Sequence, residues 1–239
     1  MKNATSKNLQ KLVLLFHPRS GSSWLRSMLD ENDYVWMVHE ILARVGSPGQ
    51  QHAKIDDVYN QGRPKRITVV GSKVAPYQII DKIGFVQQVR DLGIKPIVIQ
   101  RRSLVRTVIS QIRRRELSDR ELEAGRQAAQ NLRVDMEPLG PSTINSEEFT
   151  RFLLSDYKER SNLMLLASAF DQRLELVYED LLEDPAHCLA QVSDFIGTEI
   201  DYLGDGVIAR NTGDDLSAVV TNLAELRAVT ERLGFAFDA

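Results

Sequence analysis

Short apolar runs alternate with stretches of helical periodicity along most of this chain. The first run, Leu12 to Phe16, has the length of one buried strand, and a polar turn containing a glycine follows it. From Ser22 to Asp30 the apolar residues recur with the period of a helix. The same reasoning predicts further strands at 67–71, 94–100 and 174–178. It also predicts helices from Ser103, from Pro185 to Gly197 and over 216–233, and a helix or turn over 179–183.

Strands that alternate with amphipathic helices are typical of a parallel sheet covered by helices on both faces. We therefore expect an α/β fold of three layers with a mostly parallel central sheet, built as a single domain over 1–239. The segment 116–146 is polar and contains Pro138 and Gly140. We expect a helix over 120–132 within it, and a lid or acceptor-binding insertion as its role.

Charge and cysteine content narrow the classes of function. The net charge of -3 argues against a general nucleic-acid partner, which is usually bound by a basic surface. A single cysteine, Cys188, excludes an internal disulfide framework and a cysteine-rich metal site. No apolar run approaches the roughly 18 residues of a membrane span, and the N-terminal segment has no signal-peptide core. We expect a cytoplasmic protein.

The turn over 17–23 carries the first candidate chemistry. A strand, a tight turn and a helix together aim backbone N–H groups and the helix dipole at one point, which suits an anion. The nucleotide-triphosphate loop G-x-x-x-x-G-K-S/T needs a lysine after its second glycine, whereas here Ser22 follows Gly21. The cation is Arg19, which precedes the glycine. The turn predicts a P-loop-like anion site, and the alternative is a plain strand-to-helix turn capped by serine.

With this loop, the sequence resembles the sulfotransferases that use 3'-phosphoadenosine 5'-phosphosulfate (PAPS), and within them the bacterial, carbohydrate or tyrosylprotein type. The family pattern P-K/R-S-G-S/T-S/T-W/L matches Pro18 to Trp24. The resemblance implies that the loop binds the 5'-phosphosulfate and that Trp24 stacks on adenine, although a core-facing Trp24 is an equal alternative. The residues it assigns to this end of PAPS are Arg19, Ser20, Gly21, Ser22, Ser23 and Trp24.

A second family element is an arginine at a strand end with a serine eight residues later, both on the 3'-phosphate. Arg102 and Ser110 have this spacing. Ser110 falls off the apolar stripe of its helix, on the polar side with Ser103 and Arg106. Arg210 resembles, weakly, the late basic loop that closes over the nucleotide. Segments 177–182 and 222–226 are also similar to bacterial members, and the basic block 113–115 is expected to be a solvated helix end.

The resemblance also implies the catalytic groups, namely Glu40, Arg19, Lys73 and His39. Arg19 and Lys73 would neutralise the leaving phosphate, and a solvated lysine at a strand end is the alternative for Lys73. Ala75 stands where cytosolic members carry a histidine base. Glu40 lies 21 residues after Arg19, as the base does in tyrosylprotein enzymes. Glu40 is the first choice of base and His39 the reserve; the alternative is that Glu40 caps a helix running to Arg44.

These residues together predict transfer of a sulfuryl group from PAPS to a hydroxyl of a sugar, lipid or small natural product. The products would be a sulfate ester and 3'-phosphoadenosine 5'-phosphate (PAP), and this transfer needs no metal. The alternatives are an ATP-dependent kinase of P-loop type and a nucleotide-binding module that has lost catalysis. The sequence leaves the acceptor and the oligomeric state open.

Overall fold

The computed structural model describes residues 9–128, 135–204 and 215–238. The chain divides into two compact units: Met1–Gln100 with Asn162–Gly206, and Arg101–Ser161 with Val207–Ala239. The single domain over 1–239 stays a prediction, as does the lid role of 116–146.

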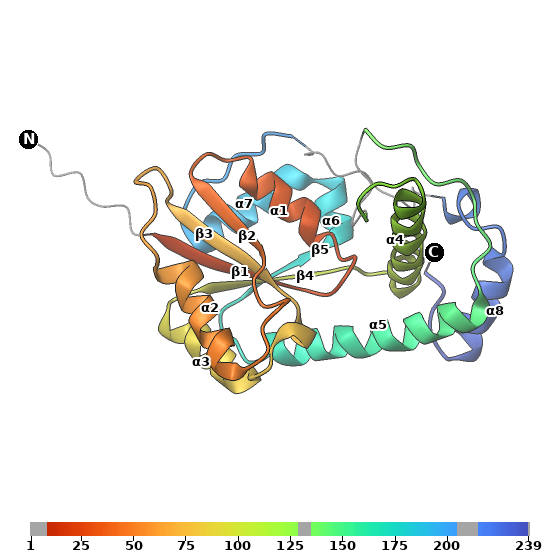
Figure 1. Cartoon of the computed structure of the whole chain (residues 1–239), viewed down its shortest axis with the longest axis horizontal. Coiled ribbons are helices and arrows are strands. Elements are labelled where there is room, and N and C mark those ends of the chain that lie inside the picture. The colour runs from red at the N-terminus through yellow and green to blue at the C-terminus, as the bar shows by residue number, and fades with distance from the viewer. Residues whose placement is uncertain (1–8, 129–134, 205–214, 239) are drawn as a thin grey trace, which may run out of the picture. The chain divides into compact units, whose positions relative to one another are not determined.

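The first unit is built on a five-stranded sheet in the order β2-β3-β1-β4-β5, with every strand pair parallel (Figure 1). An all-parallel sheet needs helical crossovers, which cover its faces. This confirms the predicted α/β class. The strands are β1 (Gln10–Phe16), β2 (Val35–Glu40), β3 (Val69–Val74), β4 (Lys95–Gln100) and β5 (Leu174–Val177).

Alternate residues of β1 enter the two apolar cores of this unit, as the period of a strand requires. Leu12, Leu14 and Phe16 face one core, with side chains from α1, α6 and α7. Val13 and Leu15 face the other core, with side chains from α2, α3 and the end of α5. The sheet is therefore the middle of three layers. These helices are α1 (Ser22–Asp30), α2 (Pro48–Asn60), α3 (Lys82–Asp91), α5 (Ser146–Ala167), α6 (Tyr178–Glu183) and α7 (Pro185–Ile196).

The second unit packs α4 (Leu104–Glu123), the first part of α5 and α8 (Leu223–Arg232) around its own core. Ser103 caps α4, as predicted, by accepting a hydrogen bond from the Arg106 backbone N–H at 3.0 Å. Two helix predictions were wrong. α4 ends at Glu123 instead of a separate helix covering 120–132, and a short 3₁₀ turn, η2 (Leu216–Ala218), precedes α8 where one helix over 216–233 was expected.

Arg113 corrects the expectation of a solvated basic block. Its side chain is only 1% exposed. It donates hydrogen bonds to the backbone carbonyls of Leu139, Gly140 and Val219 at 3.0–3.2 Å, and to Ser142 Oγ at 3.3 Å. A buried guanidinium that meets this many acceptors holds two loops of the unit to α4.

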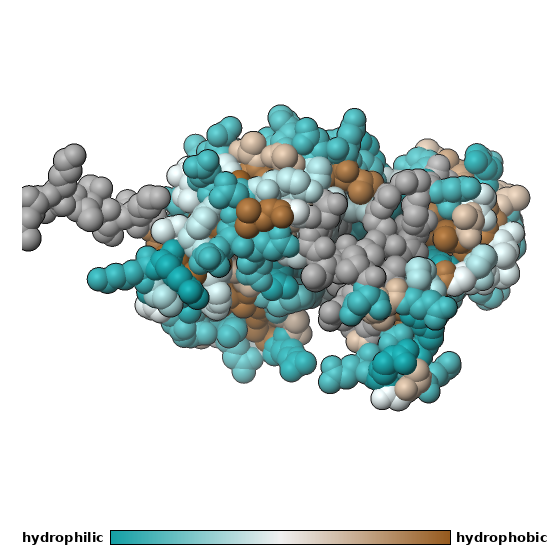
Figure 2. Space-filling view, turned by 90° about the horizontal axis from the view of Figure 1, so that it is seen from above, coloured by the Kyte–Doolittle hydropathy of each residue, from teal (hydrophilic) through white to brown (hydrophobic). Residues whose placement is uncertain are grey.

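Hydrophilic residues predominate on the face drawn in Figure 2, where hydrophobic residues form small separate patches. Within the described residues, no helix combines the length and the apolar character that crossing a membrane requires.

Candidate functional site

The loop between β1 and α1 adopts a backbone conformation that favours glycine at two positions. Gly21 is the N-cap of α1 with φ of 86°, and Arg19 has φ of 65°. A non-glycine residue in this region is strained, and such strain clusters at functional sites. The carbonyl of Gly21 accepts from the N–H groups of Trp24 and Leu25, both at 3.0 Å. The loop thus leads directly into the N-terminus of α1, the end of a helix that attracts anions.

Tyr178 explains why no side chain fits at Gly21. This residue begins α6 at the end of β5, and a methyl group built on Gly21 would overlap its ring. Trp24 meets the Tyr178 ring edge to face, with 6.3 Å between ring centroids, and packs against the neighbouring core. Trp24 therefore makes the contacts expected of a core-facing tryptophan, which was the alternative to stacking on adenine. Its stacking on adenine stays a prediction.

Lys73 lies in β3 and is 1% exposed, so the alternative of a solvated lysine is wrong. Its Nζ donates a hydrogen bond to Ser23 Oγ at 2.9 Å and lies 4.5 Å from the centroid of the Phe16 ring. Burial lowers the pKa of Lys73 to about 8; Glu40 opposes this shift, while Arg26 and Arg19 add to it. The charges of Arg19, Arg26 and Lys73 therefore lie near one another, where the β1–α1 loop and α1 meet the sheet.

A β-bulge in β2 decides which of the two candidate bases pairs with Lys73. The register pairs Val38 with Ser72 and then Glu40 with Lys73, so His39 is the extra residue. Without the bulge, alternation along the strand would set His39 in that position. Partners in register present their side chains on the same face of the sheet, so Glu40 lies beside Lys73.

The surroundings of Glu40 and His39 differ. Glu40 is half-buried, and its Oε2 accepts a hydrogen bond from Gln78 Nε2 at 2.6 Å. A turn follows Glu40, so the alternative of a helix cap is wrong. His39 lies at the surface; partial burial of its ring and the charges of Lys73 and then Arg26 lower its pKa, while Glu40 opposes them. His39 is thus neutral at neutral pH.

Arg102 and Ser110 lie in the second unit. Arg102 is exposed just before α4, and Ser110, on α4, is only 3% exposed. The sequence placed Ser110 on the polar side of this helix, and the structure shows that the residue is buried. Their joint role on a 3'-phosphate stays a prediction. Arg210 lies outside the described residues.

Two residues near this site had no role in the sequence reasoning. Arg26, one turn after Ser23 on α1, forms an ion pair with Asp30 at 2.7 Å, and Asp30 also accepts from the Met37 backbone N–H at 3.1 Å. This pair ties α1 to β2. Gln78 lies in a short 3₁₀ turn, η1 (Pro76–Gln78), after β3. Periodicity could have indicated Arg26 as a polar position of its helix, but nothing in the sequence singles out Gln78.

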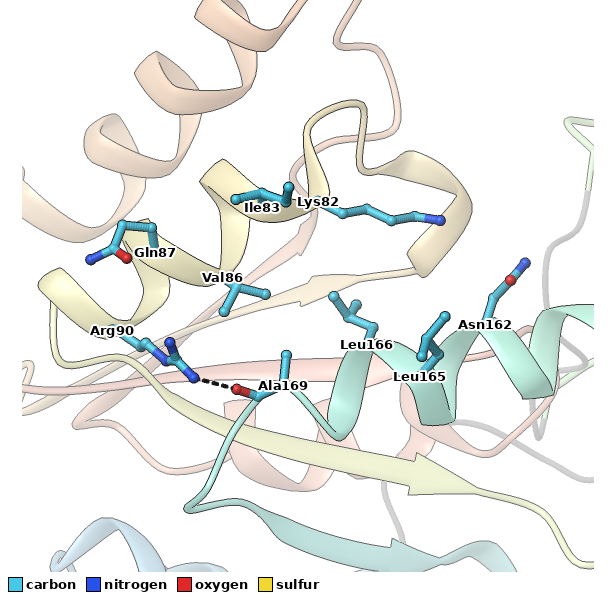
Figure 3. A pocket seen from close by; sticks show the side chains of 9 residues that line it. All are labelled: Lys82, Ile83, Val86, Gln87, Arg90, Asn162, Leu165, Leu166 and Ala169. Atoms are coloured by element: carbon cyan, nitrogen blue, oxygen red, sulfur yellow. Dashed lines mark hydrogen bonds between the residues drawn. The ribbon is translucent and has the colours of Figure 1, made fainter.

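An apolar cavity of about 350 Å³ lies elsewhere in the first unit, between α3 and the end of α5 (Figure 3). None of the predicted site residues lines this cavity. Its lining residues are Lys82, Ile83, Val86, Gln87, Arg90, Asn162, Leu165, Leu166 and Ala169.

In the part of the chain that the structure describes, no group of three or more His, Cys, Asp or Glu side chains lies close enough together to hold a metal ion.

Comparison with known proteins supplies sequence relatives over most of the chain. No protein-family model matches. Nodulation protein H of Rhizobium meliloti (strain 1021) is 26% identical, over 91% of this chain and 90% of the relative. Nodulation protein H of Rhizobium tropici is also 26% identical, over 91% of this chain and 88% of the relative.

Solved structures define the class of fold. The sulfotransferase domain of the Synechococcus PCC 7002 olefin synthase aligns with a TM-score of 0.52 and 16% identity, covering 100% of this chain and 92% of the domain. Mouse sulfotransferase SULT7A1, solved with PAP, aligns with a TM-score of 0.54 and 14% identity, covering 94% of this chain and 83% of the mouse protein. The chain has the sulfotransferase fold. This is the fold that the resemblance predicted.

Proposed function

We propose that this protein transfers the sulfuryl group of PAPS to a hydroxyl acceptor and releases a sulfate ester and PAP. The observation that carries the proposal is the buried Lys73, which is bonded to Ser23 at the start of α1 and paired in register with Glu40. Sulfuryl transfer needs a cation on the leaving phosphate and a base on the attacking hydroxyl. Lys73 and Glu40 are these two groups on neighbouring strands of a sulfotransferase fold.

The residues Pro18 to Trp24 are proposed to hold the 5'-phosphosulfate. The N–H groups at the start of α1 donate to its oxygens, and Arg19 and Lys73 neutralise the charge that develops on the leaving 5'-phosphate. The strained backbone of Arg19 and the left-handed Gly21 give the loop the sharp turn that this role requires. In the second unit, we assign Arg102 and Ser110 to the 3'-phosphate, with Arg210 as a further candidate.

Glu40 is the proposed general base, and the β-bulge supports it over His39. Glu40 removes the proton from the acceptor hydroxyl as its oxygen bonds to sulfur, and the bond from sulfur to the 5'-phosphate oxygen breaks. The leaving PAP takes the electron pair of that bond. His39, neutral at neutral pH, is the second candidate for the proton.

Sugars, lipids and small natural products are the proposed acceptor classes, and PAPS use is supported by the fold shared with a mouse sulfotransferase solved with PAP. We place the enzyme in the cytoplasm, where PAPS is made. The reaction as proposed uses no metal.

Nucleotide binding separates this proposal from a kinase. We expect PAP, in the presence of a chelator, to raise the melting temperature of the protein clearly more than ATP with Mg²⁺ does. The loop has Ser22 and Ser23 where the kinase loop has its lysine and hydroxyl residue. Stabilisation by ATP with Mg²⁺ and not by PAP would reject the sulfotransferase proposal in favour of the kinase.

A further inference from the structure

The amide side chain of Gln78 bridges two parts of the first unit. Its Oε1 accepts a hydrogen bond from the backbone N–H of Ala75 at 3.0 Å, and its Nε2 donates to Glu40 Oε2 at 2.6 Å. Gln78 is only 7% exposed and Ala75 is fully buried. The bridge therefore joins the turn after β3 to the end of β2.

The orientation of this amide is determined by the chain. A backbone N–H can only donate, so the oxygen of Gln78 must face Ala75 and the NH₂ group must face Glu40. The reverse orientation would leave the buried Ala75 N–H without an acceptor, which costs about 1–3 kcal/mol, and would set two oxygens against each other. Glu40 thus always meets a donor at Oε2.

We propose that Gln78 is a positioning residue that occupies Oε2 of Glu40 and fixes the plane of its carboxyl group, so that Oε1 receives the proton of the acceptor hydroxyl. This inference rests on the proposed function. A hydrogen bond to the charged form of a carboxylate favours that form. The neutral amide does so without adding a second charge beside Lys73. The bond also fixes the plane of the carboxylate, which aims Oε1 for proton transfer.

Gln78→Glu isolates this role because it changes one group and keeps the size of the side chain. The new carboxylate still accepts from the Ala75 N–H but sets an oxygen against Glu40 Oε2. Two carboxylates at hydrogen-bond distance share one proton, so Glu40 becomes harder to ionise. A Gln78 that served only the turn would need nothing beyond the Ala75 bond, and Q78E would then behave as the wild type.

The direct test is the titration of Glu40 followed by NMR of protein labelled at the glutamate carboxyl carbons. The Glu40 resonance is the one missing from Glu40→Gln. In Q78E its midpoint should move up by about one pH unit or more, and in Gln78→Leu it should move up by less. The matched control is Gln87→Glu, because Gln87 makes the same kind of bond to a carboxylate, Asp91, on the surface of α3 at 2.8 Å. An unchanged Glu40 midpoint in Q78E would overturn the proposal; if Q78E does not fold, an unchanged midpoint in Q78L would do so.

Turnover provides the second readout. In Q78E the acidic limb of the kcat profile should move to higher pH with the Glu40 midpoint, while KM for PAPS stays within about twofold, because the loss affects proton transfer and not nucleotide binding. A rise in KM with kcat unchanged would contradict a positioning role. The titration itself needs no turnover. A wild type that transfers no sulfuryl group would therefore contradict the proposed function, while the effect of Gln78 on Glu40 could still be measured.

Discussion

The amine of Lys73 donates a 2.9 Å hydrogen bond to the hydroxyl of Ser23 and so joins the interior of the sheet to the first turn of α1. Burying an ammonium group costs free energy, and the pKa of about 8 expresses that cost. An arriving anion would find a desolvated cation already in place. Before the anion binds, the same cation destabilises the fold.

Lys73→Met should therefore stabilise the ligand-free protein at pH 7. Between pH 8 and 10.5 the folded state binds fewer protons at Lys73 than the unfolded state, so wild-type stability rises with pH across that window, by on the order of 3 kcal/mol at most. The variant lacks this group. Its advantage should be largest below pH 8 and shrink towards pH 10, as measured by chemical denaturation at both pH values.

The control for this comparison is Lys54→Met, which removes an exposed lysine of α2 paired with Asp57. It should change stability little at either pH. A Lys73→Met variant that is less stable than the wild type at pH 7, or whose advantage does not depend on pH, would contradict a buried, destabilising charge.

Gly21→Ala should destabilise the protein more than Gly197→Ala. Both glycines have left-handed backbones, with φ of 86° and 74°, so an alanine at either position is strained by about 1 kcal/mol or more. At Gly197 the methyl group meets nothing within 4 Å, whereas at Gly21 it overlaps the ring of Tyr178. We expect about 1–3 kcal/mol of additional loss at Gly21, measured as the difference in unfolding free energy. Equal losses at the two positions would show that Tyr178 does not restrict the loop.

Arg102→Ala and Ser110→Ala should weaken the binding of PAP far more than that of AMP, which lacks the 3'-phosphate. Loss of a charged contact to phosphate should cost about tenfold or more in the Kd of PAP, as measured by calorimetry. Arg115→Ala is the control, because this arginine of the same helix is exposed and pairs with Glu148. Equal weakening of PAP and AMP binding would remove the 3'-phosphate assignment.

Arg113→Leu should destabilise the second unit by about 2–5 kcal/mol, because it removes a buried guanidinium that donates hydrogen bonds to three backbone carbonyls. Arg114→Leu, which changes the half-buried neighbour, is the comparison. The expected ranking is a much lower melting temperature for the Arg113 variant. A similar melting temperature for both would restore the idea of a solvated block.

The strands that the sequence predicted are those with short stretches of apolar or β-branched residues. β1 and β4 contain uninterrupted apolar runs, β3 and β5 contain shorter apolar stretches, and the bounds of all four agree with the predicted ranges to within three residues. β2 was not predicted: it lies at the sheet edge, pairs only with β3, and ends in the polar residues His39 and Glu40. α2 and α3 were missed for a related reason, since each buries few apolar residues and is otherwise polar.

The features of the candidate site also divide into those that the sequence predicted and those that it did not. Arg19, Lys73 and Glu40 were named as candidates because each matches a position that the resemblance to the sulfotransferases marks. The β-bulge at His39 and the bond from Gln78 to Glu40 depend on how β2 and the turn after β3 meet in three dimensions. Sequence spacing along one strand does not contain this information, so the sequence could not predict which of Glu40 and His39 lies in register with Lys73.

PAPS-dependent transfer can be measured with PAPS radiolabelled in its sulfuryl group, in the presence of a chelator and a panel of sugar, lipid and small-molecule hydroxyl acceptors. The wild type should form one or more labelled sulfate esters with an equal amount of PAP, and Glu40→Gln should bind PAP normally yet transfer about 100-fold more slowly. If the wild type binds PAP but labels no acceptor, or if it instead transfers phosphate from ATP, the protein is not a PAPS-dependent sulfotransferase.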